Sequence, residues 1–307
     1  TVLSSKDMVN DEEYKKFNQK KFFEELYSDF YDKKFVDSDE INFNINSSRT
    51  GNYLENVCFI TGFGYKPSAE DCLSGYSQEK TNVLFLGDST AHNYFIGMKR
   101  FLEKENYDNF SLNVLAVTGC VPLVDDYKRG QNFTGKEEKC EYAYDEINKI
   151  INTYEFDKIF VSYRYKYFYE HKSQDFIFES SYFDFEKKLM ELNDKTEVYL
   201  IGTSVLLTED SKNFNENILL NENKIFIFSD NFLDKQVFEI DKKIRQRMYL
   251  ADINYIPLLD YICEDIYCLN VLKVGNEFYR FVHDRIHLSL EASMFLAENL
   301  FLQYLTE

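Results

Sequence analysis

The sequence predicts an α/β fold: a three-layer α/β/α sandwich whose mostly parallel, five-stranded sheet lies between two layers of helices. From residue 82 onward, short apolar runs typical of buried strands alternate with segments of helical spacing, which indicates parallel strands joined by helical crossovers. The 307 residues, 44% of them hydrophobic and 17% aromatic, suffice for one large domain or two small ones.

We expect residues 1–57 to form an N-terminal extension or linker and residues 58–307 to form the α/β domain. The extension is charged and aromatic. Helical spacing over residues 11–32 predicts a helix that packs on the domain or bridges to a missing upstream part. Glycine and proline predict a loop over residues 47–70, with a short strand near residues 58–60.

The remaining elements follow in order along the chain. Strands are expected at residues 82–86, 112–117, 158–162, 197–201 and 253–259. Helices are expected at residues 93–105, 136–154, 182–192, 232–252 and 290–302. Residues 205–230 are Asn-rich and predict an irregular lid or insertion, and a hairpin of residues 269–273 and 277–281 should turn at Gly275-Asn276.

The first strand of the sheet ends in a candidate nucleophile. Its apolar run, residues 83–86, stops at Gly87-Asp88-Ser89, and a segment of helical spacing follows. This pattern places Ser89 at the carboxyl end of a buried strand, beside free N–H groups at a helix N-terminus that stabilise negative charge. Ser89 is therefore a candidate nucleophile that needs a base, and Asp88 is expected to orient the turn.

The candidate base lies almost two hundred residues later, in Asp284-Arg285-Ile286-His287. An Asp and a His three residues apart can meet in a turn, so that Asp284 holds one ring nitrogen while the other faces Ser89. The predicted hairpin would return both residues to the edge of the sheet that carries Ser89. His283 and His92 are rival bases.

A second group of candidates follows the next two strands. Gly119 could turn its backbone N–H toward the pocket and stabilise an oxyanion together with the N–H of Ser89, although it could also be a plain turn glycine. Arg164 could donate to the oxyanion or to a sugar hydroxyl. The rings of Tyr163 and Tyr165 could stack on a sugar, or belong to an ordinary exposed loop.

Composition narrows the classes of partner. A formal net charge of −18 argues against binding nucleic acid or an anionic membrane and is compatible with a neutral glycan. No apolar run approaches the ~18 residues of a transmembrane helix, and no signal peptide is visible. Because the sequence begins at Thr1 rather than Met, we expect a processed chain or a piece of something longer.

The six cysteines fall as three near pairs: Cys58 and Cys72, Cys120 and Cys140, and Cys263 and Cys268. Proximity favours these pairings among the ~15 that six cysteines allow. Disulfides would indicate an oxidising compartment, whereas the alternative is six buried thiols in a cytosolic protein. With no C-x-x-C spacing and only four histidines, we expect no metal site.

The paired motifs resemble the SGNH (GDSL-like) hydrolase superfamily, whose first block holds Gly-Asp-Ser and whose last holds Asp-x-x-His. Further details resemble the C-terminal SGNH domains fused to membrane acyltransferase-3 proteins, over roughly residues 58–305. These details are Gly119-Cys120-Val121-Pro122, Tyr163-Arg164-Tyr165 and the ending His287-Leu288-Ser289. Two features depart from that pattern: Thr90 stands where the branch usually has histidine, and Arg164 stands near the place of the third-block Asn.

The resemblance implies a flavodoxin-like SGNH fold and a serine-dependent O-acetyltransferase that modifies a bacterial cell-surface polysaccharide such as lipopolysaccharide. It implies a periplasmic or extracytoplasmic location beside a membrane-embedded acyltransferase-3 domain upstream in the same chain. No cofactor is expected, because that partner would supply the acyl group from acetyl-CoA across the membrane. The alternatives are a secreted carbohydrate O-acetylesterase and a glycan-binding module with an inert triad.

Overall fold

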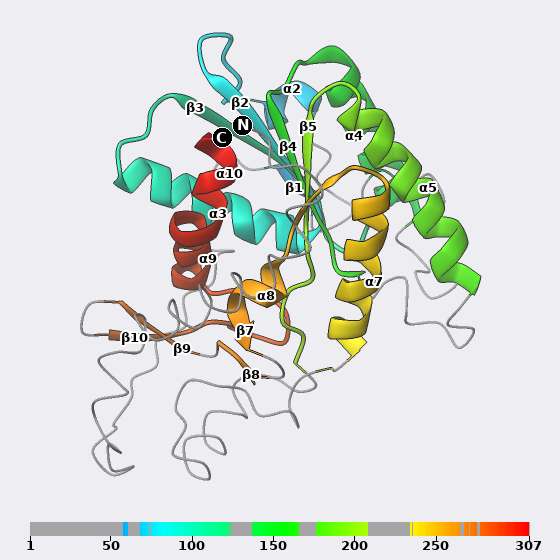
Figure 1. Cartoon of the computed structure of the whole chain (residues 1–307). Helices are drawn as coiled ribbons and strands as arrows, with labels where there is room; N and C mark the ends of the chain where they lie inside the picture. The colour runs from blue at the N-terminus through cyan, green and yellow to red at the C-terminus, as the bar shows by residue number, and fades with distance from the viewer. Residues whose placement is uncertain are drawn as a thin grey trace, which may run out of the picture.

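The computed structural model describes residues 58–60, 68–73, 75–121, 123, 137–165, 176–207, 234, 236–264, 267–269, 271–274 and 277–306. A six-stranded sheet in the order β1-β3-β2-β4-β5-β6 forms its centre (Figure 1). Every pairing in this sheet is parallel. The strands are β1 (Cys58–Ile60), β2 (Thr81–Gly87), β3 (Phe110–Val117), β4 (Lys158–Ser162), β5 (Glu197–Ile201) and β6 (Asn254–Ile256).

The predicted fold class is confirmed. The five expected strands are β2 to β6, and the short strand expected near residue 58 joins the sheet as its edge strand β1. Strand β6 ends before its expected limit because Pro257, which lacks an N–H, follows it and leads into α8 (Leu258–Ile262). The predictions for residues 1–57 and for most of 205–230 lie outside the described residues.

Helices cover both faces of the sheet (Figure 1). One face carries α3 (Ser89–Lys104) and a continuous C-terminal helix made of α9 (Leu290–Leu296), the π-helical η5 (Ala297–Phe301) and α10 (Leu302–Thr306). The other carries α4 (Glu137–Thr153), α5 (Phe176–Asn193) and α7 (Gln236–Leu250). A short helix, α2 (Ala69–Cys72), follows β1.

The core follows the alternation of side chains along each strand. In β2, Val83 and Phe85 pack into the cluster beneath α3 and α9, whereas Leu84 and Leu86 pack into the cluster beneath α4 and α5. All four are fully buried. A strand that is buried on both faces reads as a continuous apolar run, which is why β2 was recognisable in the sequence.

Helices α3 and α9 approach each other closely at Gly97. A Cβ at this position would lie 2.3 Å from the carbonyl carbon of Ser293 in α9. Ser289 begins α9 by accepting a hydrogen bond from the N–H of Ala292. This contact fixes the start of the C-terminal helix directly after the Asp284–His287 motif.

Short elements between β6 and α9 return the chain to the carboxyl edge of the sheet. They are α8, the pair β7 (Cys263–Glu264) and β8 (Tyr267–Cys268), and the expected antiparallel hairpin of β9 (Val271–Val274) and β10 (Glu277–Arg280). The hairpin leads into a turn closed by a bridge between Val282 and Leu288 and by a hydrogen bond from His283 N to His287 O. This turn holds Asp284 and His287.

Three disulfides join the pairs that proximity favoured. Cys58–Cys72 links β1 to α2, Cys120–Cys140 links the segment after β3 to α4, and Cys263–Cys268 links β7 to β8. Within the described part of the chain, no helix is both long and apolar enough to cross a membrane.

Candidate active site

The turn between β2 and α3 has little freedom. Gly87 has a φ of +154°, and a Cβ there would lie 1.6 Å from the backbone oxygen of Ser162 at the end of β4. Asp88 then begins α3, because its Oδ1 accepts hydrogen bonds of 2.8 Å from both the N–H and the hydroxyl of Thr90. Ser89 is therefore the first residue of α3, four residues before the helix was expected to start.

Asp88 also ties this turn to the neighbouring strand. Its Oδ2 accepts a 2.8 Å hydrogen bond from the backbone N–H of Arg164, and the Thr90 hydroxyl lies 2.8 Å from that of Ser162. Asp88 is fully buried, and burial raises its pKa against the opposing effect of the hydrogen bonds from Thr90 and Arg164. These contacts fit the expected role of Asp88 in orienting the turn.

The turn after β10 places a carboxylate against an imidazole. Asp284 Oδ1 accepts 2.8 Å hydrogen bonds from the N–H groups of Ile286 and His287, and its Oδ2 lies 2.6 Å from His287 Nδ1. Burial alone would raise the pKa of Asp284, but the hydrogen bond and charge of His287, with the two backbone N–H groups, hold it well below its usual range. The carboxylate is therefore ionised at neutral pH.

The two turns meet at a single contact. His287 Nε2 lies 2.7 Å from Ser89 Oγ, across 198 residues of sequence. The structure thus brings together a serine hydroxyl, an imidazole within hydrogen-bond reach of it, and a carboxylate that contacts the other ring nitrogen. This arrangement can carry out nucleophilic acyl transfer, in which the histidine accepts the serine proton.

The rival histidines lie close by, in less suitable surroundings. His92 is buried within α3, and burial, followed by the charge of His287, lowers its pKa to about 4. A group with so low a pKa is a weak base at neutral pH. His283 Nδ1 lies 3.7 Å from Asp284 Oδ2, a longer approach than that of His287 Nδ1 to the same oxygen.

Two backbone N–H groups were predicted to stabilise an oxyanion, those of Ser89 and Gly119. Ser89 provides one at the first turn of α3, and Gly119, with a φ of +76°, provides another just beyond β3. Strand β3 pairs directly with β2, so both residues lie beyond the carboxyl ends of neighbouring strands. Among the described residues, neither N–H has a hydrogen-bond acceptor.

The prediction that Tyr163 and Tyr165 stack on a sugar is wrong in this conformation. They are 2% and 3% exposed, their ring centroids lie 4.2 Å apart, and Tyr163 packs edge-on against Phe185 of α5. The Tyr165 hydroxyl donates to the backbone oxygen of Ile201. Residues 163–165, directly after β4, run over the core rather than into solvent, so both rings belong to the core.

Arg164 lies between these tyrosines and is half-buried. Its backbone N–H donates a hydrogen bond to Asp88 Oδ2. Arg164 also lines a small cavity of about 40 Å³ together with Thr90, Ser162 and Ile286. A donor role toward the oxyanion or a sugar hydroxyl stays a prediction. Sequence reasoning missed Ser162, although a polar residue at the end of a buried apolar strand was a usable signal.

A family model described as "SGNH domain (fused to AT3 domains)" matches residues 57–300. The chain belongs to this SGNH family. The Thr90 hydroxyl, at the position where the resemblance led us to expect a histidine, joins Asp88 to Ser162.

One solved structure shares the fold of this chain. The periplasmic domain of a lipopolysaccharide acetyltransferase from Salmonella ser. Paratyphi A aligns with a TM-score of 0.61 at 16% identity, covering 89% of this chain and 100% of that one. A protein described as an acylhydrolase from Bacteroides fragilis aligns at 0.42 and 9% identity, covering 76% of this chain and 90% of that one. No curated protein matches in sequence.

Among the described residues, no cluster of side chains could hold a metal ion.

Proposed function

We propose that this chain is a serine-dependent O-acyltransferase domain that transfers an acetyl group to a hydroxyl of a bacterial cell-surface polysaccharide. One observation carries the proposal: Ser89 Oγ contacts His287, which in turn contacts Asp284. The family to which the chain belongs is described as an SGNH domain fused to AT3 domains.

In the first half-reaction, Ser89 Oγ attacks the carbonyl carbon of an acyl ester while His287 Nε2 takes the serine proton. Asp284 stays ionised and stabilises the imidazolium that forms. The oxyanion is held by the N–H groups of Ser89 and Gly119, and removing one such donor typically lowers the rate about 10²–10³-fold. The tetrahedral intermediate expels the donor's oxygen, which takes the proton from His287, and an acyl-serine remains.

The second half-reaction uses the same groups. An acceptor hydroxyl loses its proton to His287 Nε2 as its oxygen attacks the acyl carbon, and Ser89 Oγ leaves with that proton. Arg164 is a further candidate donor, either to the oxyanion or to an acceptor hydroxyl. No step in either half-reaction requires a cofactor.

The setting of this reaction follows from the family. Its members are fused to AT3 domains, so we place a membrane-embedded acyltransferase-3 domain upstream in the same chain, supplying acyl groups from acetyl-CoA across the membrane. The three disulfides favour an oxidising compartment, which in this setting is the periplasm. A net charge of −18 is compatible with a neutral glycan acceptor. The resemblance makes lipopolysaccharide one candidate class of acceptor.

A carbohydrate O-acetylesterase is the second candidate, because the same triad hydrolyses an acyl-serine when water takes the place of the sugar hydroxyl. The two functions differ only in the acceptor. The outcome therefore depends on whether a glycan reaches the acyl-serine before water does.

The deciding experiment measures turnover of a chromogenic acetyl ester by the native chain and by Ser89→Ala, with and without a lipid A-free O-antigen polysaccharide as acceptor. We expect turnover that is lost in Ser89→Ala, and acetylated polysaccharide in the acceptor arm. Free acetate with no acetylated polysaccharide would favour the esterase. A native chain that neither turns over the ester nor reacts with a fluorophosphonate probe at Ser89 would overturn both enzymes.

A further inference from the structure

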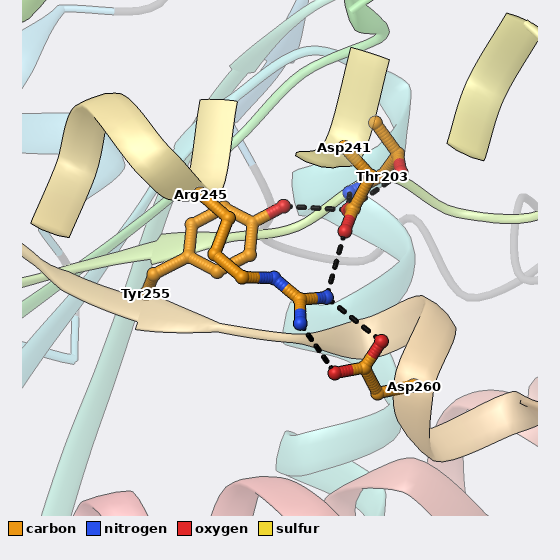
Figure 2. A network of polar contacts seen from close by, with 5 residues as sticks. All are labelled: Thr203, Asp241, Arg245, Tyr255 and Asp260. Carbon is orange, nitrogen blue, oxygen red and sulfur yellow. Dashed lines mark hydrogen bonds and ion pairs between the residues drawn. The ribbon is translucent and has the colours of Figure 1, made fainter. Parts of the chain in front are cut away.

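A buried carboxylate on helix α7 lies at the centre of a polar network (Figure 2). Asp241 is 3% exposed and accepts hydrogen bonds from Thr203 N (3.1 Å), Thr203 Oγ1 (2.8 Å), Tyr255 Oη (2.5 Å) and Arg245 Nη2 (2.9 Å). Arg245 also binds both carboxylate oxygens of Asp260. A buried charge is costly unless it is paired and hydrogen-bonded, and here the carboxylate has both kinds of partner.

The network fixes the start of residues 202–207, which we call the β5 segment because they follow β5. Thr203 donates twice to Asp241, and Gly202 N donates to the backbone oxygen of Ile256 at 2.8 Å. A Cβ on Gly202 would lie 2.6 Å from Tyr255 Oη, so the backbone passes directly against the network. Burial and the charge of Asp241 raise the pKa of Tyr255, which therefore keeps the proton it donates.

The far end of the β5 segment holds the turn that contains the base. Leu207 N donates to the backbone oxygen of Arg285 at 3.0 Å, and Arg285 Nε donates to the backbone oxygen of Leu207 at 3.1 Å. Arg285 lies between Asp284 and His287. A continuous path of hydrogen bonds and backbone thus runs from Asp241, through Thr203 and the β5 segment, to the turn that aims His287 at Ser89.

We propose that Asp241 and Thr203 are positioning residues for the base: they fix the β5 segment, and the β5 segment holds the Asp284–His287 turn against Ser89. This inference rests on the proposed function, because it assigns the network to the geometry of that same site. The 2.7 Å contact between His287 Nε2 and Ser89 Oγ leaves little tolerance, and a misplacement of about 1 Å can cost about 10²-fold in rate.

The same helix offers a matched control. Arg247, two residues beyond Arg245, donates from Nε to Glu186 Oε2 of α5 at 2.7 Å. This contact also joins α7 to a neighbour through a charged hydrogen bond, but it ties α7 to a helix rather than to the β5 segment. Losing it should weaken the fold without moving His287.

The experiment compares Thr203→Val, Thr203→Ser, Asp241→Asn and Arg247→Gln with the native chain. Thr203→Val keeps the shape of the side chain but removes the hydroxyl donor, and Asp241→Asn is a second variant in case the first does not fold. For each chain, kcat and KM for the chromogenic ester are measured, together with the downfield NMR resonance of the His287 Nδ1 proton.

We expect Thr203→Val and Asp241→Asn to lower kcat about tenfold with KM nearly unchanged, because the base is displaced while substrate contacts remain. Their His287 resonance should move. Thr203→Ser should restore both readouts, and Arg247→Gln should leave both as in the native chain.

A native kcat and an unmoved resonance in both Thr203→Val and Asp241→Asn would overturn the inference, as would an equal loss of kcat in Arg247→Gln. If the native chain shows no Ser89-dependent turnover, the proposed function fails. The His287 resonance then still decides the positioning role, since it depends on geometry and not on turnover.

Discussion

Asp284→Asn tests the orientation of the base most directly. The native carboxylate accepts 2.8 Å hydrogen bonds from the N–H groups of Ile286 and His287, and its other oxygen lies 2.6 Å from His287 Nδ1. An asparagine can keep its oxygen on the two backbone donors, but its NH₂ group then faces Nδ1. To accept a hydrogen bond from that NH₂ group at Nδ1, the ring must carry its proton on Nε2. Nε2 then has no free electron pair to receive the Ser89 proton.

The expected loss is large. In serine-triad enzymes the equivalent change lowers kcat about 10⁴-fold, which corresponds to about 5.5 kcal/mol of transition-state stabilisation. Here we expect about 10³–10⁴-fold, with KM nearly unchanged, because Asp284 acts through the imidazole rather than on the substrate. Turnover of the chromogenic acetyl ester measures both constants, and the rate of fluorophosphonate labelling at Ser89 should fall in parallel.

A matched control separates orientation from folding. Asp157 accepts a 2.7 Å hydrogen bond from the backbone N–H of Asn82 at the opposite end of β2, so Asp157→Asn makes the same chemical change far from Ser89. It should leave kcat unchanged. Asp284→Asn with more than about a tenth of native kcat, or an equal loss in Asp157→Asn, would refute the assigned role of Asp284.

Three further predictions concern the frame of the site. Gly87→Ala should lower the unfolding free energy by about 3 kcal/mol in urea denaturation, because its Cβ would lie 1.6 Å from Ser162 O; an unchanged midpoint would contradict this packing. Replacing both Cys120 and Cys140 by serine should lower the unfolding free energy by about 3 kcal/mol relative to the native chain, measured under non-reducing conditions. The folded pKa of Asp284 is lowered, so its stabilising effect is full above about pH 4 and is lost as the pH falls further. The stability difference between native and Asp284→Asn should therefore shrink on acidification below pH 4, and a difference that grows would contradict the sign.

The sequence predicted those parts of the site that depend on the order of strands and turns. A buried apolar run that stops at Gly87-Asp88-Ser89 fixes the place of the nucleophile, because parallel strands present their carboxyl ends at one edge. The antiparallel pairing of β9 with β10 was predictable, because Gly275-Asn276 stands between two strand-like runs in the sequence. The return of His287 to Ser89 then followed from topology rather than from any local pattern.

Other parts of the site were not predictable, because they depend on which way a side chain points. Tyr163 and Tyr165 follow a strand in a polar, aromatic segment that reads as an exposed loop, yet α5 packs over Tyr163 and buries it. The contact between Thr203 and Asp241 joins residues 38 apart in sequence, and nothing in their spacing distinguishes it from any other polar pair. Such contacts form only when the helices pack against the sheet.

The strand order explains why the site forms around Ser89. Strand β2 lies at the centre of the sheet. After β2 the chain forms β3 on one side of it, and then crosses to form β4 and β5 on the other side. Connections that leave a strand in opposite directions open a crevice beyond its carboxyl end, where doubly wound sheets bind their ligands. Gly119 approaches Ser89 from the β3 side, whereas the β5 segment brings the turn with His287 from the other. The predicted oxyanion donor Gly119 and the turn with His287 therefore lie on opposite sides of the strand that ends at Ser89.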